Sequence, residues 1–579
     1  MEPIIGIDLG TTNSEVSFYY DGKINVINDA DNGIMPSVVG LNDDGSIVVG
    51  REAVNQAAIA PERTVLSIKR RMGTDAVIGL GDNTFSPQEI SAFILKALKR
   101  RAEKHIKQAV SKAVITVPAY FTDAQRQATR EAGEIAGLEV VRIINEPTAA
   151  ALTYHQEDDN QTRHLLVYDL GGGTFDVSIV KIESGVVEVL ASTGNNQLGG
   201  DDFDRKIVDE LVVHLKRKHE LDVTADFRVM SRLLRAAEAA KCALSSSPYT
   251  NIEEDHVGNK DGQDVHLSME LSRERLEELI KDDLSQTMRA VTQALKDASM
   301  MPSAIDQIIL VGGSTRIPRI SELLEEKFNI RPHGEIDPDL CVAMGAGIQA
   351  AREMGMDDAT VLVDITPYSF GTSAVGIVNG EPSMTQFVPL ISRNTKLPAT
   401  RTEAFATMVN NQEAVEVNVY QGEAPDAMDN VRLGNYMFYL TKAPAGSTIT
   451  LQFDLNLNGI LKIKAVEKDS GKHIDAVIEN ALPRIDDAVL TETRARIDTL
   501  LPPEQGEAAG ATAGSDDLPM EFTDIVQRAE KLLDTAAEDD AEEIVNLIED
   551  IRDAVKAKDM EQARGHRDAL DDLLFYLDS

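Results

Sequence analysis

The chain has 579 residues, of which 42% are hydrophobic and 26% are charged, so it is long enough to build several globular domains. Its formal net charge of −39 disfavours nucleic acid as a main partner, because phosphate backbones are bound by clustered Lys and Arg. There is neither a run of about eighteen apolar residues nor a basic N-terminal leader. We therefore expect a cytoplasmic protein that does not act on a membrane.

The two cysteines, Cys242 and Cys341, are far apart in the sequence and lie in apolar surroundings. Their spacing matches neither a disulfide framework nor a metal site. We expect both to be buried, reduced thiols that pack as small hydrophobic side chains.

Residues 1–358 alternate short apolar runs with helical periods, which is typical of an α/β domain. The expected strands include Ile4–Ile7, Ala113–Val117, Leu165–Tyr168 and Gln307–Val311. The expected helices include Pro87–Ile106, Asp123–Ala136, Arg273–Ala298 and Ile320–Phe328.

Two segments of this zone resemble each other. Asp8–Ser17 is Asp-Leu-Gly-Thr-Thr-Asn-Ser-Glu-Val-Ser, and Asp169–Ser178 is Asp-Leu-Gly-Gly-Gly-Thr-Phe-Asp-Val-Ser. Each follows an apolar strand and precedes another, so each predicts a hairpin with a glycine-rich turn. Backbone N–H groups in such turns approach an anion closely, Thr hydroxyls add donors, and Asp can hold a metal or its waters. One such turn would be an ordinary hairpin, but two in the same register favour a shared phosphate site.

A third glycine-rich turn, Leu310–Pro318, connects an expected strand to an expected helix. Alone it would be an ordinary strand-to-helix turn. Beside the two hairpins it is a candidate adenosine site, with Arg316 able to stack on a base. The chain lacks the G-x-x-x-x-G-K-[ST] motif, so it is not a P-loop protein.

Residues 365–483 lose the helical periods and alternate apolar with polar side chains, as in Glu413–Tyr420 and Ile449–Val466. Turn signals such as Ser470-Gly471 interrupt this alternation. The pattern predicts a compact antiparallel β domain.

Residues 484–579 return to helical spacing, with apolar positions such as Ile544, Leu547 and Ile551. They predict a small helical bundle with an acidic outer face. Within this region, residues 502–518 have the glycine- and alanine-rich composition of a flexible segment.

Together these motifs resemble the DnaK chaperones, the heat-shock-seventy family, over nearly the whole chain. The short segment between Met72 and Phe85 is similar to the HscC-like branch. Besides the two hairpins, the matching stretches are Val117–Ala136, Arg142–Leu152, Leu198–Asp204 and Gly312–Pro318, and in the β domain Arg393–Thr395, Gln421–Glu423 and Asn458–Leu461.

The resemblance implies a multidomain fold. An actin-like α/β ATPase domain with duplicated ribonuclease-H-like halves would occupy 1–358, followed by a linker at 359–364. An antiparallel β-sandwich would occupy 365–483, and an α-helical lid region 484–579. The implied cofactors are ATP or ADP and Mg²⁺, with K⁺ as a further candidate ion.

The resemblance also assigns nucleotide-site residues. Catalytic positions would be Lys69, Glu146, Asp169 and Thr174, and Asp8, Asp169 and Asp176 would hold the metal through waters. The remaining nucleotide contacts would come from Gly10, Thr11, Thr12, Asn13, Gly171, Gly172, Gly173, Thr174, Gly199, Gly200, Glu238, Lys241, Gly312, Gly313, Ser314, Arg316 and Asp339.

Two further sets carry the expected coupling and peptide binding. J-domain and linker coupling would use Arg142, Asn145, Thr148, Val361, Leu362, Val363 and Asp364. The peptide groove would be lined by Val375, Phe405, Met408, Val415 and Val417. Without the resemblance, residues 361–364 would be an ordinary buried strand and the groove residues plain sheet core.

The implied function is an ATP-hydrolysing chaperone for unfolded or client polypeptide, stimulated by a J-domain partner and served by a nucleotide-exchange factor, and we expect a monomer. Two alternatives stay open: an actin-fold kinase acting on a small acceptor, and a nucleotide-sensing scaffold. Asn410 and Ala445 stand where the family often has an acid and an arginine that latch the lid, so we expect a weakly latched lid.

Overall fold

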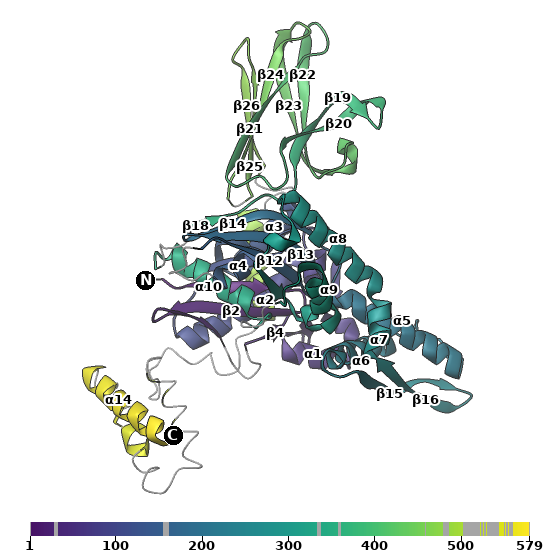
Figure 1. Cartoon of the computed structure of the whole chain (residues 1–579), viewed down its shortest axis with the longest axis vertical. Helices are drawn as coiled ribbons and strands as arrows, with labels where there is room; N and C mark the ends of the chain where they lie inside the picture. The colour runs from purple at the N-terminus through teal and green to yellow at the C-terminus, as the bar shows by residue number, and fades with distance from the viewer. Residues whose placement is uncertain are drawn as a thin grey trace. The chain divides into compact units, whose positions relative to one another are not determined.

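The computed structural model describes residues 2–27, 33–154, 161–332, 337–356, 361–457, 459–478 and 486–501, and part of 522–577. The chain divides into two compact units, Met1–Pro502 and Pro503–Ser579 (Figure 1). The expected boundaries at 358 and 483 and the segment 502–518 lie outside the described residues.

The first sheet of unit 1 has the order β11-β10-β1-β2-β3, with β4 paired to β2. β10 and β11 run parallel to β1, whereas β2 and β3 are antiparallel neighbours. The bounds are β1 Ile4–Leu9, β2 Asn13–Tyr20, β3 Lys23–Val26, β4 Met35–Pro36, β10 Lys112–Val117 and β11 Glu139–Asn145.

A second sheet repeats this arrangement, in the order β17-β12-β13-β14-β18. As in the first sheet, a parallel strand, here β17, flanks a run of three consecutive antiparallel strands, here β12, β13 and β14. β18 then pairs parallel with β14. The bounds are β12 Arg163–Leu170, β13 Phe175–Glu183, β14 Val186–Asn195, β17 Gln307–Val311 and β18 Val361–Val363. The echo between the two glycine-rich hairpins is therefore matched by an echo in strand order.

Two of the helices in these halves begin at capping boxes that the sequence supplies. Ser86 and Glu89 form a capping box at the start of α2, and Thr122 and Gln125 form another at the start of α3. The bounds are α1 Arg51–Ala57, α2 Pro87–Ile106, α3 Asp123–Ile135, α4 Glu146–Thr153, α5 Gly200–His219, α6 Phe227–Ser246, α9 Pro318–Phe328 and α10 Cys341–Glu353.

Smaller elements complete the halves. The short strands are β5 Val39–Leu41, β6 Ile47–Val49, β7 Thr64–Val65, β8 Ile78–Leu80 and β9 Asn83–Phe85, and a longer hairpin joins β15 Tyr249–Lys260 to β16 Gln263–Ser272. The 3-10 helices include η1 Pro61–Arg63, η2 Ile68–Arg71, η3 Pro302–Ala304 and η4 Gly313–Arg316.

The expected single helix over 273–298 is wrong, because it is two helices, α7 (Arg273–Leu279) and α8 (Lys281–Asp297). Ile280 lies between them with φ −95° and ψ 4°, outside the helical region. The Lys206 ammonium donates to the Leu279 carbonyl at 3.2 Å and forms an ion pair with Asp283 at 2.5 Å. A cation from α5 thus satisfies groups on both sides of the break, which periodicity could not reveal.

The β domain consists of two four-stranded antiparallel sheets, β20-β19-β22-β23 and β21-β24-β25-β26. Alternating side chains such as Val419, Phe438 and Phe453 fill the space between them. The bounds are β19 Phe370–Val378, β20 Glu381–Ile391, β21 Ala399–Ala406, β22 Gln412–Gln421, β23 Val431–Ala443, β24 Thr448–Leu455, β25 Leu461–Glu467 and β26 His473–Ile478, with η5 at Ala427–Asp429.

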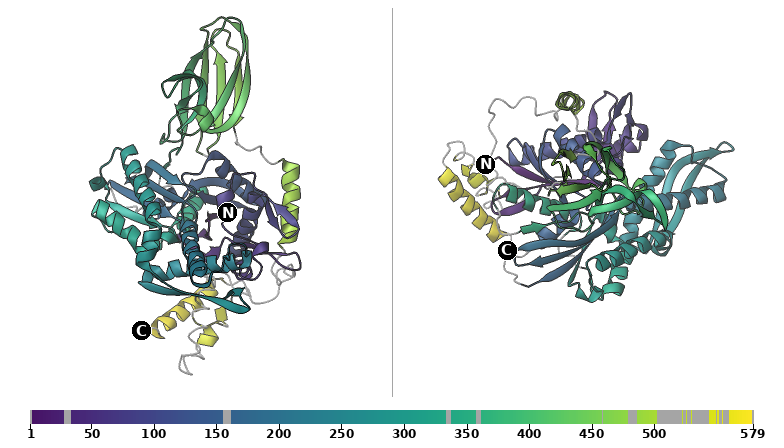
Figure 2. Two further views of the ribbon diagram at one scale, coloured as in Figure 1. Left: turned by 90° about the vertical axis from the view of Figure 1, so that its right-hand side faces the viewer. Right: turned by 90° about the horizontal axis from the view of Figure 1, so that it is seen from above.

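Helix α11 (Asp487–Leu500) packs on α2 and α3 of unit 1 (Figure 2). Arg496 donates to the Thr84 carbonyl at 2.6 Å, and its guanidinium lies 4.4 Å from the Phe85 ring centroid. Lys96 and Asp498 form an ion pair in the same contact. In unit 2, α14 (Met560–Leu577) contributes Leu570 and Leu574 to a small apolar core.

Candidate nucleotide site

The two glycine-rich hairpins meet at one cavity of about 320 Å³. A Cβ on Gly172 would lie 1.9 Å from Thr12 Oγ1, and one on Gly173 would lie 2.7 Å from Thr11 Cγ2, so the two turns touch. The predicted residues that line the cavity are Asp8, Gly10, Thr11, Thr12, Asn13, Lys69, Glu146, Asp169, Gly171, Gly172, Thr174, Glu238, Lys241, Gly312, Gly313, Ser314, Arg316 and Asp339.

Four predicted residues stand behind this lining. Gly173 packs against Thr11 and Arg70, and the Gly200 N–H donates to the Gly171 carbonyl at 3.0 Å. A Cβ on Gly199 would lie 2.4 Å from the Gly172 carbonyl oxygen, so only glycine fits there. Asp176 lies directly across the hairpin from Asp169. These residues shape or support the cavity wall.

The first hairpin needs glycine at its turn. A Cβ on Gly10 would lie 2.0 Å from the Asn13 carbonyl oxygen. The Gly10 N–H donates to Ser14 Oγ at 3.2 Å, and the Ser37 hydroxyl donates to the Gly10 carbonyl at 2.9 Å. Buried serines therefore hold the turn on the side away from the cavity, and its other side lines the cavity.

Carboxylates surround Lys69, a buried lysine, at one end of the cavity. Lys69 Nζ lies 2.6 Å from Glu146 Oε1, and both side chains are buried. Burial alone lowers the pKa of Lys69, but the charges of Glu146 and Asp8 outweigh it and raise that pKa. Lys69 therefore remains an ammonium ion.

The pKa values of the neighbouring carboxyl groups are also raised, which for an acid favours the neutral form. Burial, followed by the charge of Glu146, raises the pKa of Asp8 to about 7 and raises the pKa of Asp169 and Asp176 well above the usual range. Neither carboxylate oxygen of Asp176 has a hydrogen-bond partner among the described residues. An additional cation would relieve this repulsion, so the donor set fits a hard divalent ion.

Within the described part of the chain, no three His, Cys, Asp or Glu side chains converge closely enough to hold a metal directly. Oxygen ligands that stand back from an ion can still hold it through its waters, which is the arrangement magnesium commonly keeps. The geometry therefore leaves room for a hydrated ion beside Asp8, Asp169 and Asp176.

The opposite end of the cavity is built by α6 and the η4 turn. Lys241 forms an ion pair with Asp204 at 2.8 Å, and burial raises the pKa of Asp204 to about 7. Ser314 Oγ donates to the Gly171 carbonyl at 2.9 Å, which ties this turn to the second hairpin. Arg316 is held by Asp337 and Asp339, each at 2.7 Å.

Cys242 corrects the expectation of two buried thiols. Cys341 is buried, but Cys242 is exposed and lines the cavity next to Lys241. Consecutive side chains on a helix point about 100° apart, so burial of Lys241 on α6 leaves Cys242 on a more exposed side. Sequence reasoning also missed Asp201, Glu15 and Ser245, which line the same cavity.

Three of the predicted coupling residues, Asn145, Thr148 and Asp364, lie together, whereas Arg142 does not join them. Asp364 Oδ2 accepts hydrogen bonds from Asn145 Nδ2 at 2.8 Å and from Thr148 Oγ1 at 3.4 Å. Burial raises the pKa of Asp364. Arg142 instead lies 3.4 Å from Glu353 on α10.

The segment Val361–Val363 pairs as β18 with β14, parallel, with Val361 opposite Val186. It therefore extends the second sheet by one short strand. Two further contacts, missed by sequence reasoning, join the β domain to this region. The Tyr368 hydroxyl donates to the Tyr120 carbonyl at 2.8 Å, and Arg393 forms an ion pair with Asp297 at 2.7 Å.

The predicted groove residues divide into two groups. Val417 is buried in the sandwich core, and Phe405 and Val415 pack against that core. Met408 and Val375 are exposed and do not belong to it. Asn410 Oδ1 accepts from the Ala445 N–H at 3.0 Å, so the two positions expected to lack an ion pair are hydrogen-bonded neighbours.

With this geometry in hand, comparison with known proteins decides the family. The model of the Hsp70 protein family matches residues 4–80 and 75–577. The chain belongs to the Hsp70 family. The predicted resemblance is thereby confirmed, whereas the HscC-like branch stays a prediction.

Relatives of this Hsp70 chain include three proteins named Chaperone protein DnaK. The one from Thermotoga neapolitana is 42% identical over 578 residues, covering 97% of this chain and 94% of its own. The one from Thermotoga maritima is 45% identical over 486 residues, covering 82% and 80%. The one from Thermosipho africanus is 41% identical over 584 residues, covering 98% and 95%.

Family membership favours an ATP-hydrolysing chaperone over the two alternatives, a small-acceptor kinase and a scaffold. The described residues contain no helix long and apolar enough to cross a membrane.

Proposed function

We propose that this protein is an ATP-dependent chaperone in which hydrolysis in the cavity between the two hairpins controls how tightly the β domain holds an apolar peptide. One observation carries the proposal. Asp364, at the end of the proposed linker, accepts hydrogen bonds from Asn145 and Thr148, which lie within two residues of Glu146 of the cavity. Nucleotide and peptide sites would thus be linked through adjacent residues.

The proposed division follows the repeated strand order. Residues 1–358 would be an actin-like ATPase domain built from two ribonuclease-H-like halves, 359–364 its linker, 365–483 a β-sandwich for substrate and 484–579 a helical lid region. The matching order of the two large sheets supports duplicated halves. The facing β-sheets around one apolar core support the sandwich.

In the ATPase site, backbone N–H groups of the two turns would bind the phosphate chain, with Thr11, Thr12 and Thr174 adding hydroxyl donors. Bound Mg²⁺ would neutralise charge on the transferred phosphoryl group. Asp8, Asp169 and Asp176 would hold that ion through waters. K⁺ is a further candidate occupant of the same acidic end.

Lys69 and Glu146 would act on the reacting groups themselves. The buried ammonium of Lys69 would stabilise negative charge on the γ-phosphate, which is the main requirement of phosphoryl transfer. Glu146, whose Oε1 lies 2.6 Å from Lys69 Nζ, would orient the attacking water with its other carboxylate oxygen, Oε2. Glu238, Lys241, Ser314, Arg316 and Asp339 would hold the adenosine.

In the β domain, an extended client segment would bind by main-chain hydrogen bonds and apolar contacts near Phe405, Met408 and Val415. Val375 and Val417 would border that groove. The hydrogen bond between Asn410 and Ala445 is compatible with a lid that lacks an ion-pair latch, so we propose that the lid opens easily.

We further propose a monomer in the cytoplasm that works with a J-domain partner and a nucleotide-exchange factor. Arg142, Asn145 and Thr148 would form part of the J-domain contact. Asn145 and Thr148 bond to Asp364, and Arg142 lies on the same strand, β11, as Asn145. The short segment between Met72 and Phe85 supports placing the chain in the HscC-like branch.

The decisive experiment measures the affinity of a fluorescent apolar peptide for the full-length protein, first with ATP and then with ADP. We expect weaker binding with ATP, because the two sites would be thermodynamically linked. Equal affinity with both nucleotides would refute the coupling. Release of free phosphate, with no phosphorylated acceptor, would separate this function from the kinase alternative.

A further inference from the structure

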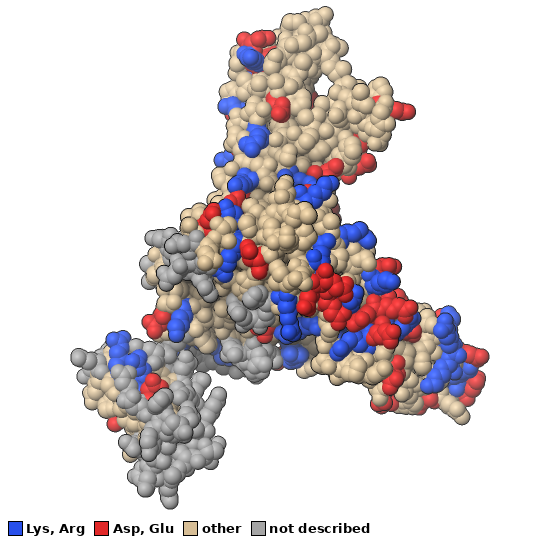
Figure 3. Space-filling view, in the orientation of Figure 1, with Lys and Arg blue, Asp and Glu red and all other residues tan. Residues whose placement is uncertain are grey.

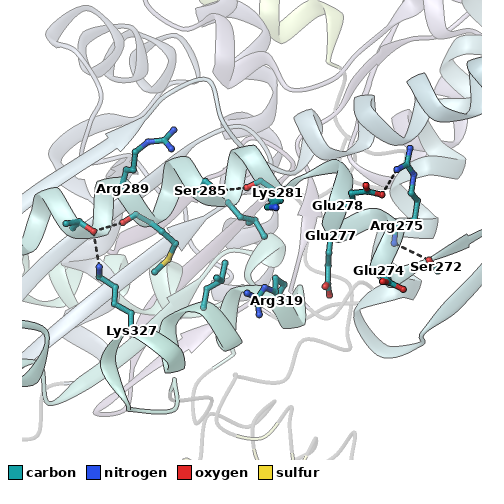
Figure 4. Close-up of a pocket in the computed structure, with 14 residues that line it drawn as sticks. Ser272, Glu274, Arg275, Glu277, Glu278, Lys281, Ser285, Arg289, Arg319 and Lys327 are labelled. Atoms are coloured by element: carbon teal, nitrogen blue, oxygen red, sulfur yellow. Dashed lines mark hydrogen bonds and ion pairs between the residues drawn. The ribbon is translucent and has the colours of Figure 1, made fainter.

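A second groove lies away from the nucleotide site, between α8 and α9 and beside α7. Its volume is about 1030 Å³, about the upper end of the range for ligand pockets. None of the predicted site residues lines it. Figure 4 shows its two long walls, with Lys281 and Ser285 on α8 and Arg319 and Lys327 on α9, while Arg289 extends from α8 at the rim, away from α9.

The floor of this groove is apolar. Leu284 and Met288 lie four residues apart on α8, so their side chains share one helix face. Leu323 of α9 completes the floor from the other wall. Met288 and Leu323 are only partly buried, so apolar surface remains open to a partner. A floor of this kind accepts side chains spaced by one helical turn.

The charges along the groove are segregated. Lys281 and Arg289 are exposed and have no carboxylate partner among the described residues, and Lys327 bonds only to the Thr292 hydroxyl, at 2.9 Å. Carboxylates gather at the α7 end instead, where Glu278 pairs with Arg275 (Figure 4). A chain with a net charge of −39 thus keeps unpaired cations along one apolar floor.

We propose that this groove is a docking site for an acidic amphipathic helix of a partner protein. Its apolar side chains would lie on Leu284, Met288 and Leu323, and its carboxylates would face Lys281, Arg289 and Lys327. The apolar floor favours a peptide over a simple anion, and the unpaired cations favour an acidic peptide over a basic one. The helices of unit 2 are poor occupants, since Leu570 and Leu574 of α14 already face its own core.

Because of the position of the groove, a bound partner would affect how the neighbouring elements move relative to one another. α7 packs on α5, α6 and β16, whereas α8 packs on β13 and β14. The groove therefore spans the break at Ile280, with α6, which carries Glu238 and Lys241 of the cavity, packed against α7, and with β13 and β14 of the second sheet packed against α8. A helix bound across the break would restrain these two bodies, and, if the proposed nucleotide site is right, slow ADP release.

The test uses the full-length protein and a fluorescein-labelled helical peptide with leucines at i and i+4 flanked by glutamates. A matched peptide replaces the glutamates with lysines. The variant Lys281→Glu with Arg289→Glu reverses the groove cations. The control Arg217→Glu with Lys218→Glu makes the same charge change on exposed residues of α5, outside the groove.

We expect the acidic peptide to bind the wild type and the control alike, and the groove variant about tenfold more weakly, with a binding that weakens as salt rises. Met288→Gln should also weaken binding several-fold without changing the salt dependence. Equal binding of the basic peptide, equal loss in the control, or displacement by inorganic polyphosphate at equal affinity would overturn the helix-docking proposal.

The same titration, followed by release of a fluorescent ADP analogue, tests the restraint. Slower release with the acidic peptide supports it, and unchanged release at saturating peptide overturns it. Peptide binding is measured without nucleotide, so a protein that binds the peptide but no ADP would contradict the proposed ATPase and leave the docking site standing.

Discussion

The nucleotide cavity and the β domain differ in how they expose their chemistry. The cavity buries charged groups, with Lys69, Glu146 and Asp176 almost inaccessible to solvent. The β domain does the reverse, since large apolar side chains such as Met408 and Tyr439 are exposed. Figure 3 shows few charged side chains on the visible face of the β domain and many along α7 to α9. A buried charged site tolerates little change, whereas an exposed apolar surface can adapt to many ligands.

The substitution Lys69→Ala tests the buried, charged site of this comparison most strongly. Removing the buried lysine beside these carboxylates should lower steady-state ATP hydrolysis by roughly 10²–10³-fold, the loss typical of removing one preorganised charge-stabilising group. Phosphate release measures it, and Lys218→Ala on the surface of α5 is the matched control. Survival of hydrolysis in Lys69→Ala would contradict the assigned chemistry, provided that circular dichroism shows an intact fold.

The next prediction concerns the junction between the two regions. Asp364→Ala removes the acceptor of the Asn145 and Thr148 hydrogen bonds. The ratio of peptide affinities in ATP and ADP should then fall toward one, from the roughly 5–150-fold typical of linked sites. Asp306→Ala, which loses only a surface contact with His164, should keep the wild-type ratio.

Within the β domain, two substitutions separate binding from packing. Val417 is 6% exposed in the core, so Val417→Ala should destabilise the fold by about 1–3 kcal/mol in chemical denaturation. Met408 is 60% exposed, so Met408→Ser should leave stability nearly unchanged and lower peptide affinity several-fold. If both variants lost stability alike, Met408 would belong to the core and not to a binding surface.

The smallest expected effect is a change in pH dependence. Burial raises the pKa of Asp204 to about 7, so the folded state binds a proton that the unfolded state has released above its ordinary pKa. Stability from this group is present at low pH and is lost as pH rises through about 7. The melting temperature of nucleotide-free Asp204→Asn should therefore rise relative to that of the wild type as the pH increases from about 5 to about 8. Parallel pH profiles would show that Asp204 does not titrate there.

Much of the nucleotide site could be predicted because its chemistry is local in sequence. Asp8 and Asp169 each stand beside the turn that they serve, and the shared register of the two hairpins indicated that they meet. The start of α2 is local in the same way, because Ser86 and Glu89 form its capping box. Structure that depends on residues close together in the sequence can be predicted in this way, because the local preferences agree with the final fold.

What could not be predicted depends on partners remote in sequence. Tyr368 meets Tyr120 across 248 residues, and no periodicity indicates such a pair. The break at Ile280 depends on Lys206 from another helix, and the outward position of Cys242 depends on how α6 packs. Tertiary contacts override the local pattern in each case.

The short strand β18 has a consequence for how the molecule can switch. Only three residues, Val361–Val363, are added to the rim of an already complete sheet. Peeling them away would expose little apolar area and disturb no other strand, because β18 is the outermost member and nothing pairs beyond it among the described strands. If residues 359–364 are the proposed linker, β18 could separate from β14 and pair with it again at low free-energy cost, while the remaining strands of the sheet stay paired.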